Sequence, residues 1–190
     1  MTGPVFAGPR HSPAVSVDDI VEVLEASPGF DLTERPGPRH HLLDHSLQTA
    51  EVLRRSHPDD LELQLAGLVH DIGHLLPPHR DDAHAEVAAV FVRPVLGDRV
   101  AGLVRLHVSA KRYLVTTDPD YRGSLDQGSV FSLRQQGGDM APAEVLAFEQ
   151  EPLVADALVL RRADEAGKVP GLSVPGLDSW TAALDQYAVG

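Results

Sequence analysis

The densest group of side chains that could do chemistry lies in the segment LVHDIGHLL, residues 68–76. His70 and Asp71 are adjacent, and His74 follows His70 by four positions, which places both histidines on one face of a helix. Because the neighbouring residues are apolar, these polar groups should be at least half-buried and should need partners, which a metal ion supplies to imidazole and carboxylate alike. A solvent-facing polar patch is the alternative, but an adjacent His-Asp pair inside an apolar helix favours the metal.

Other candidate metal ligands lie on separate predicted helices, before and after the His-Asp pair. Asp71 could bridge two ions about 3.5–4 Å apart. One ion would then take His45, His70, Asp71 and Asp164, and the other would take Asp71, His84 and His107. Such imidazole and carboxylate ligands suit iron, manganese, zinc or similar divalent metals. For Asp164 alone, a charged helix face shared with Arg161 and Glu165 is an equal alternative.

Composition limits both the class of protein and the kind of metal site. The chain has 190 residues, ten histidines, no cysteine and a net charge of −12. Without cysteine there can be no disulfide, thiolate nucleophile or iron–sulfur cluster, so any metal must be held by His, Asp and Glu. The acidic balance argues against binding to nucleic acid or to an anionic membrane. No apolar run approaches the roughly 18 residues of a membrane span, and the N-terminus lacks a signal-peptide layout, so we expect a cytoplasmic protein.

Helical periodicity dominates the chain, and no alternation of polar and apolar residues predicts a strand. Residues 1–16, rich in Pro, Gly and Ser, are expected to form a disordered tail, and residues 17–190 to form one all-α domain. Loops are expected at 28–39 and 115–128. The predicted helices lie near residues 18–24, 41–55, 60–75, 81–92, 97–112, 129–136, 141–149 and 152–167 and around Trp180. The candidate ligands come from several of these helices, which must pack together to form a site.

The order H…HD…D over roughly residues 40–168 resembles the HD-domain superfamily, whose members are all-α helical bundles with one or two metals. A narrower resemblance is to the mixed-valent diiron HD oxygenases, which include 2-amino-1-hydroxyethylphosphonate oxygenase and, more distantly, inositol oxygenase. It is carried by DHSLQTA, LVHDIGH, HVSAKRYL, SLDQGSVFSLRQQGG and LVLRRADEAGK. Lys111 follows His107 by four residues, Ser129 follows Lys111 by 18, and Arg161 precedes Asp164 by three, as in the phosphonate oxygenases.

This resemblance implies two iron ions in a mixed-valent Fe(II)/Fe(III) state, with O2 as co-substrate. The reaction it implies cleaves the C–P bond of a small 1-hydroxyphosphonate and releases phosphate and a carboxylic acid. The implied iron ligands are the six residues of the two sets above. Asp71, His74 and Lys111 would be catalytic, and His74, Lys111, Ser129 and Arg161 would contact the anionic substrate. Arginine and lysine suit a phosphonate because they form charge-assisted hydrogen bonds.

Two other functions remain as alternatives. One is an HD-type metal-dependent phosphohydrolase acting on a phosphate ester or nucleotide, and the other is a non-enzymatic ligand-binding HD module. Lys111, Ser129 and the segment Gln136-Gly137-Gly138 favour the oxygenase. The loop 28–39 departs from the family pattern, because it lacks the tyrosine and the aligned glutamate that read a substrate amine. A substrate without the amine, or with an extra negative charge near Arg35, is therefore our hypothesis.

Overall fold

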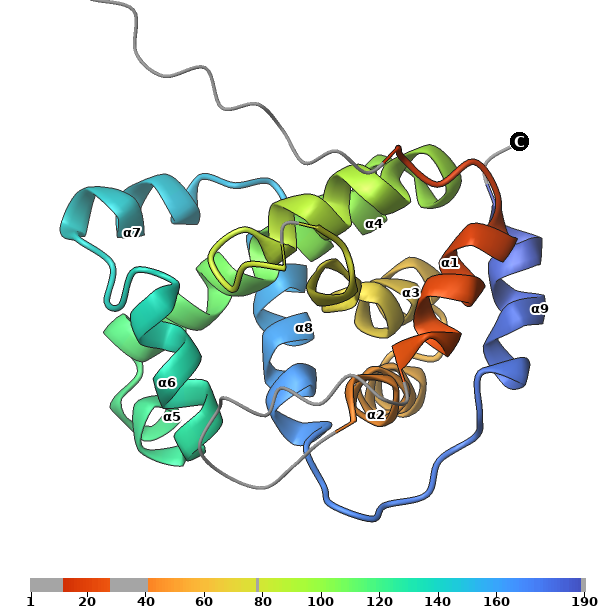
Figure 1. Cartoon of the computed structure of the whole chain (residues 1–190). Helices are drawn as coiled ribbons and strands as arrows, with labels where there is room; N and C mark the ends of the chain where they lie inside the picture. Colours follow the sequence, from red (N-terminus) through yellow and green to blue (C-terminus); the bar gives the residue numbers. More distant parts are fainter. Residues whose placement is uncertain (1–11, 28–40, 78, 189–190) are drawn as a thin grey trace, which may run out of the picture.

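The computed structural model describes residues 12–27, 41–77 and 79–188, and in these ranges it contains helices and no β-strand (Figure 1). The all-α expectation is therefore confirmed. The helices are α1 (Val17–Glu25), α2 (Leu42–Ser56), α3 (Leu61–Val69), the 3-10 helix η2 (Ile72–Leu75), α4 (His84–Thr117), α5 (Pro119–Ser124), α6 (Gln127–Gln135), α7 (Pro142–Glu149), α8 (Val154–Ala166) and α9 (Asp178–Tyr187).

Helix α3 forms the centre of the core. Every residue from Leu63 to Val69 is buried, because the sequence of this helix is apolar on all sides. It packs against α2, α4 and α8, and α2 and α4 both pack against α8 as well. Figure 1 shows α1 and α9 side by side at the edge of this bundle, away from α5, α6 and α7. The predicted metal ligands lie on or next to the four central helices.

The beginning of the described chain contacts the domain. Ala14 is buried, and its backbone N–H donates to the carbonyl of Phe91, with an N–O distance of 3.0 Å. Ser16 then caps α1 in a reciprocal pair with Asp19, whose carboxylate accepts from the Ser16 backbone N–H. Residues 1–11 of the expected tail lie outside the described residues. The division into a tail and one domain stays a prediction.

The predicted helix 60–75 is wrong in its second half. Helix α3 ends at Val69, and a turn at residues 70–71 leads into η2, so His70 and His74 do not share one α-helical face. Gly73 allows this path, because a Cβ at this position would lie 2.0 Å from the carbonyl oxygen of His84. The turn thus lets the start of α4 approach the His-Asp pair closely.

Two further expectations need correction. The predicted helices 81–92 and 97–112 form one element, α4, interrupted at Gly97, whose φ of 76° is not helical. The expected loop 115–128 is largely helical, since α4 continues to Thr117 and α5 follows. Asp118 starts α5 by accepting a hydrogen bond from the Tyr121 backbone N–H at 3.0 Å, and Pro119 follows it. The Asp-Pro pair was the overlooked start signal.

No helix in the described ranges is both long enough and apolar enough to cross a membrane.

Candidate metal centre

Asp71 lies between two pairs of histidines that come from different parts of the chain. Its Oδ2 atom is 3.7 Å from His45 Nε2 and 3.6 Å from His70 Nε2. Its Oδ1 atom is 3.3 Å from His84 Nε2 and 3.5 Å from His107 Nε2. The turn after α3 thus places the Asp71 carboxylate between two sets of histidines. His45 of α2 and His70 at the end of α3 lie on one side, and His84 and His107 from the two halves of α4 lie on the other.

All four of these histidines are oriented in the same way. Each ring directs Nδ1 at a backbone carbonyl, so Nδ1 carries the proton and donates, and Nε2 of the neutral ring keeps its lone pair. The pairs and their N–O distances are His45 with Gly167 (3.0 Å), His70 with Gly67 (2.8 Å), His84 with Asp81 (2.6 Å) and His107 with Val104 (2.7 Å). Such carbonyl partners are typical of histidines that bind metals through the other nitrogen.

The Nε2 atoms meet in pairs. His45 Nε2 is 3.2 Å from His70 Nε2, and His84 Nε2 is 3.0 Å from His107 Nε2. Because these nitrogens present lone pairs to each other and to the Asp71 carboxylate, they repel unless a cation lies among them. The donor set therefore fits two metal ions, one at each pair. His45, His70 and Asp71 form one group of closely spaced ligand atoms, and Asp71, His84 and His107 form another.

Asp164, near the end of α8, adds a carboxylate to the first pair. Its Oδ1 is 3.2 Å from His45 Nε2, and its Oδ2 is 3.8 Å from His70 Nε2. Asp164 is 2% exposed, which excludes the alternative of a solvated charged face. Burial opposes ionisation, but Arg161 and Lys168 hold the pKa of Asp164 well below its ordinary value. The structure thus brings all six predicted ligands together, and their metal-binding role stays a prediction.

The protonation states favour metal binding. Burial lowers the pKa of His70 to about 4 and also lowers the pKa of His107. Burial would raise the pKa of Asp71, but the charges and hydrogen bonds of the surrounding histidines, led by His70, hold it well below its ordinary value. His45 is the exception, because Asp164 and Asp71 outweigh burial and raise its pKa, so this ring would release a proton when a metal binds. Ionised carboxylates beside largely neutral imidazoles are the states that metal ions require.

His74 lies beside the second pair. Its Nε2 is 3.8 Å from Asp71 Oδ1, and its ring stacks on His84 with 4.0 Å between the ring centroids. On its other side, Nδ1 is 3.7 Å from Asp81 Oδ1. Its expected contact with substrate stays a prediction, and the geometry places it where a group bound near Asp71 would meet it.

Lys111 is buried on α4 and points at α6. Its Nζ donates to Ser132 Oγ at 2.6 Å and to Gln136 Oε1 at 3.1 Å. Gln136 begins the Gln-Gly-Gly segment that the resemblance to the phosphonate oxygenases singled out. This contact shows that the segment helps to hold the Lys111 ammonium group. Ser132 was missed. Its signal was the spacing of three residues from Ser129, which puts both hydroxyls on one face of α6.

Ser129 and Arg161 meet two charged residues that the sequence analysis did not assign to the site. Lys168 Nζ donates to Ser129 Oγ at 2.8 Å, and Ser129 Oγ lies 3.3 Å from both carboxylate oxygens of Glu165. The Arg161 guanidinium donates to the carboxylates of Asp164 and Glu165. Asp164, Glu165 and Lys168 lie within five consecutive residues at the end of α8, so their spacing was the available signal.

Arg161 also contacts a buried phenol. Its Nε donates to the Tyr121 hydroxyl oxygen at 2.6 Å. Burial raises the pKa of Tyr121 to about 12, so this phenol stays neutral. Arg161 thus donates through Nε to Tyr121 and through its two terminal nitrogens to carboxylates, which positions Asp164. Its contact with substrate stays a prediction.

Gln48 fixes the segment that follows α8. Its side-chain amide donates to the carbonyls of Val169 and Leu172 at 3.0 and 3.1 Å and accepts from the Val169 N–H at 3.0 Å. Gly167, whose carbonyl accepts from His45, packs so closely that an added Cβ would lie 2.5 Å from Thr49 Oγ1. Gln48 is buried, so it is a supporting partner of this segment and not a residue of the helix surface.

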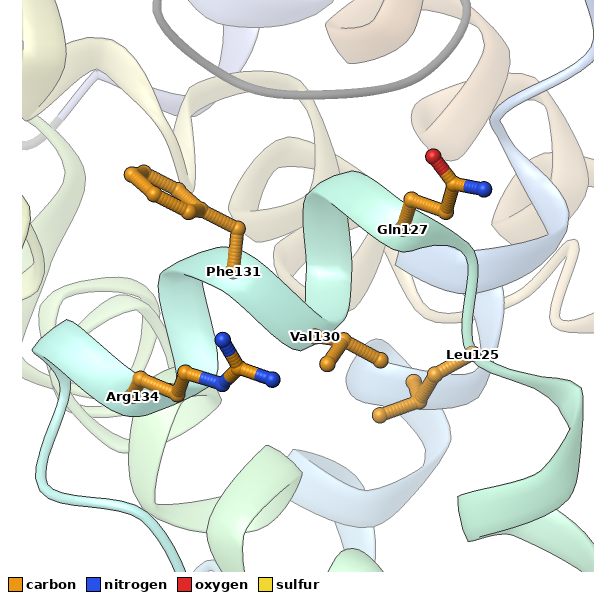
Figure 2. A pocket seen from close by; sticks show the side chains of 5 residues that line it. All are labelled: Leu125, Gln127, Val130, Phe131 and Arg134. Carbon is orange, nitrogen blue, oxygen red and sulfur yellow. The ribbon is translucent and has the colours of Figure 1, made fainter.

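The outer side of α6 carries a shallow pocket that does not include these residues (Figure 2). Its lining is formed by Leu125, Gln127, Val130, Phe131 and Arg134. The hypothesis that the loop 28–39, with Arg35, selects the substrate falls outside the described residues and stays a prediction.

Replacing Gly73 with alanine is expected to lower the free energy of unfolding by at least about 2 kcal/mol, because backbone crowding cannot be relieved by a rotamer change. The new Cβ would meet the His84 carbonyl, so metal content should fall as well. Urea unfolding and metal analysis check both effects. Gly123→Ala is the matched control, since nothing lies within 4 Å of its Cβ and stability should be unchanged or slightly higher. Equal stability of the two variants would contradict the packing argument.

Comparison with known proteins agrees with this architecture. The model of the HD domain matches residues 42–165, from the start of α2 to the end of α8. This chain belongs to the HD-domain family. The match spans all six predicted ligands, so the expectation of an HD-type helical bundle is confirmed.

Curated relatives of this HD-domain protein include two phosphonate oxygenases. It is 40% identical over 152 residues, 75% of each chain, to hydroxymethylphosphonate dioxygenase of Gimesia maris. It is 33% identical over 147 residues, 73% of this chain and 74% of the relative, to [1-hydroxy-2-(trimethylamino)ethyl]phosphonate dioxygenase (glycine-betaine-forming) of Leisingera caerulea. Inositol oxygenase of Danio rerio matches over 76 residues with 33% identity, 40% of this chain and 24% of the relative. The expected resemblance to HD-domain phosphonate oxygenases is thereby confirmed.

Proposed function

We propose that this HD-domain protein is an O2-dependent dioxygenase that cleaves the C–P bond of a small 1-hydroxyphosphonate. The observation that carries the proposal is the Asp71 carboxylate, whose two oxygens face two separate histidine pairs. The first pair also meets Asp164, which is held by the buried Arg161. The names of the two relatives that match three quarters of their length support the same chemistry. Asp71, His74 and Lys111 are the proposed catalytic residues.

The proposed reaction balances without an external reductant. One 1-hydroxyphosphonate and one O2 yield one carboxylic acid and one phosphate. The C1–H and C–P bonds break, C1 and phosphorus each gain an oxygen, and the substrate supplies all four electrons that reduce O2. For hydroxymethylphosphonate, the substrate named for the Gimesia maris relative, the products would be formate and phosphate.

His45, His70, Asp71 and Asp164 would hold one iron, and Asp71, His84 and His107 would hold the other. A mixed-valent Fe(II)/Fe(III) pair would supply the activation of O2 and the redox chemistry. The protein's own part is to keep these ligands deprotonated and fixed in direction. The backbone carbonyls fix the imidazole rings with Nε2 toward the metals, and burial disfavours the protonated forms of His70 and His107. Arg161 keeps Asp164 ionised and in place.

The remaining site residues bind and orient the anion. Lys111 is buried, so an ammonium–phosphonate contact there would be only weakly screened by water. Ser129 and Arg161 would add a hydroxyl and a guanidinium donor, and His74 would meet the substrate beside Asp71. Holding the reacting carbon near the metals in this way lowers the entropic part of the barrier. The substrate is a small anion, and a cytoplasmic location without nucleic-acid or membrane partners is part of the same proposal.

The alternative is metal-dependent hydrolysis of a phosphate ester, in which the metals would activate water. It is not favoured, because two relatives that match about three quarters of this chain are named dioxygenases.

An oxygen-dependence experiment separates the two functions. Iron-loaded protein is mixed with hydroxymethylphosphonate, with and without O2, and phosphate, formate and O2 consumption are measured. We expect one phosphate and one formate per O2 consumed and no phosphate under anaerobic conditions. Phosphate esters serve as the comparison. Anaerobic cleavage of those esters, together with no O2-dependent phosphate release, would establish the hydrolase instead.

A further inference from the structure

The chain contains two lysines among sixteen basic residues, and both lysines donate to serines of α6. Lys111 reaches Ser132 from α4, and Lys168 reaches Ser129 from the segment after α8, with Nζ–Oγ distances of 2.6 and 2.8 Å. Both serines are buried and lie one helical turn apart. A lysine ammonium is a compact charge with three donors, which suits phosphate-like oxygens. Lys168 therefore shares with Lys111 a hydrogen bond to a buried serine of α6.

Glu165 places a negative charge among three donors of this cluster. Its carboxylate accepts from Lys168 Nζ at 2.9 Å, from Ser129 Oγ at 3.3 Å and from the Arg161 guanidinium. A carboxylate near the C-terminus of a helix is disfavoured by the helix dipole, so these cations hold Glu165 there. The arrangement matches what a phosphonate group would require, since it combines two cations and a hydroxyl.

The cluster borders the metal centre, and Glu165 and Lys168 are its more accessible members. Lys168 Nζ is 3.5 Å from Asp164 Oδ1, and Asp164 contacts His45. The side chains of Glu165 and Lys168 are 16% and 17% exposed, against 4% for Arg161 and for Asp164. Glu165 and Lys168 can therefore rearrange while Arg161 and Asp164 stay in place.

We propose that Lys168 is a further substrate-binding residue and that Glu165 is an internal anion, which the substrate displaces from Lys168 and Ser129. The inference rests on the proposed function, because it assigns residues for binding the phosphonate group. Without substrate, Glu165 neutralises Lys168 and Arg161. When a phosphonate enters, it takes over these donors, and the Glu165 side chain turns toward solvent.

Binding measurements test this exchange without turnover. Iron-loaded protein under anaerobic conditions is titrated calorimetrically with hydroxymethylphosphonate and, separately, with inorganic phosphate. Lys168→Met should weaken binding of both anions by about 10- to 100-fold, the usual effect of losing a charged hydrogen bond. Glu165→Gln should strengthen binding by about three- to tenfold, because the competing negative charge is gone. Lys168→Arg, which keeps the charge, should retain most of the affinity.

Arg134→Met is the matched control, because it removes one positive charge from the exposed side of α6 (Figure 2). Its affinities should equal those of the wild type, and iron content is measured for every variant. Unchanged affinity in Lys168→Met, or iron loss with unchanged affinity, would overturn the role of Lys168. Weaker binding in Glu165→Gln would overturn the role of Glu165, and a wild-type protein that binds neither anion would overturn both.

Failure of the proposed function would look different. Wild-type protein that binds both anions with the expected variant pattern, but releases no phosphate with O2, would refute the dioxygenase and leave the anion site standing. Wild-type protein that releases phosphate with O2, while its Lys168 and Glu165 variants bind like the wild type, would refute only the anion exchange.

Discussion

Asp71→Ala is expected to remove the paired metal centre and to lower phosphonate cleavage by at least about a thousandfold, since metal stabilisation of the reaction contributes several kcal/mol. The reason is geometric. Oxygen atoms of this carboxylate lie between 3.3 and 3.7 Å from the Nε2 atoms of four histidines. Without the Asp71 oxygens, no carboxylate links the pair His84 and His107 to the pair His45 and His70. Iron per chain and the EPR signal of a coupled mixed-valent pair measure the loss.

The control for Asp71→Ala is Asp82→Ala, which removes the same charge from an exposed position paired with Arg80. It should load iron like the wild type. If Asp71→Ala also retained two irons per chain and the coupled signal, the bridging role would be wrong.

The second large effect is expected for Lys111→Met, which should raise the KM for hydroxymethylphosphonate by about 10- to 100-fold with full iron content. The ammonium group contacts Ser132 and Gln136 on the side of α6 that faces the core, and Lys111 is not among the predicted ligands. Methionine preserves most of the buried length of the side chain, so the fold should tolerate it. Steady-state kinetics and iron analysis measure the two quantities separately.

Arg105→Met on the same helix, α4, is the control for Lys111→Met. Arg105 is half-exposed and pairs with Glu151 at 3.2 Å, away from the predicted site residues. Its KM should match that of the wild type. A Lys111→Met protein with unchanged KM, or one that has lost its iron, would show that Lys111 acts through the structure and not through the substrate.

Local sequence pattern was sufficient for the helix content but not for every helix end. The spacing of apolar residues identified α3 and α8, because this spacing can be read from residues that are close together in the sequence. The same spacing predicted that the helix continues past Val69, because the end of α3 depends on a contact with α4. At the turn, Gly73 lies so close to the His84 carbonyl that a Cβ would not fit, and these two residues belong to different elements. No local signal in LVHDIGHLL records that approach.

On the proposed anion-binding side of the site, too, local sequence pattern identified only part of the residues. Lys111, Ser129 and Arg161 were singled out from their spacing within matched motifs. For Lys168 and Glu165 the sequence offered only their closeness to Asp164, and their contacts with Ser129 appeared when the end of α8 was seen against α6. Their positions in the sequence predict a solvated helix end, whereas tertiary packing makes them half-buried partners of Ser129.

The sequence by itself determined the chemistry that is available. The chain has no cysteine, so its histidines and aspartates indicated a metal site of imidazole and carboxylate ligands. Its lysine and arginine residues in the matched motifs indicated an anionic substrate, because side-chain type decides which ligands can bind. Only the tertiary structure decided that the two oxygens of Asp71 face opposite histidine pairs and that Glu165 lies among the proposed anion-binding groups. The physical reason is that direction and distance depend on which helix faces meet, and these contacts join residues up to 122 positions apart.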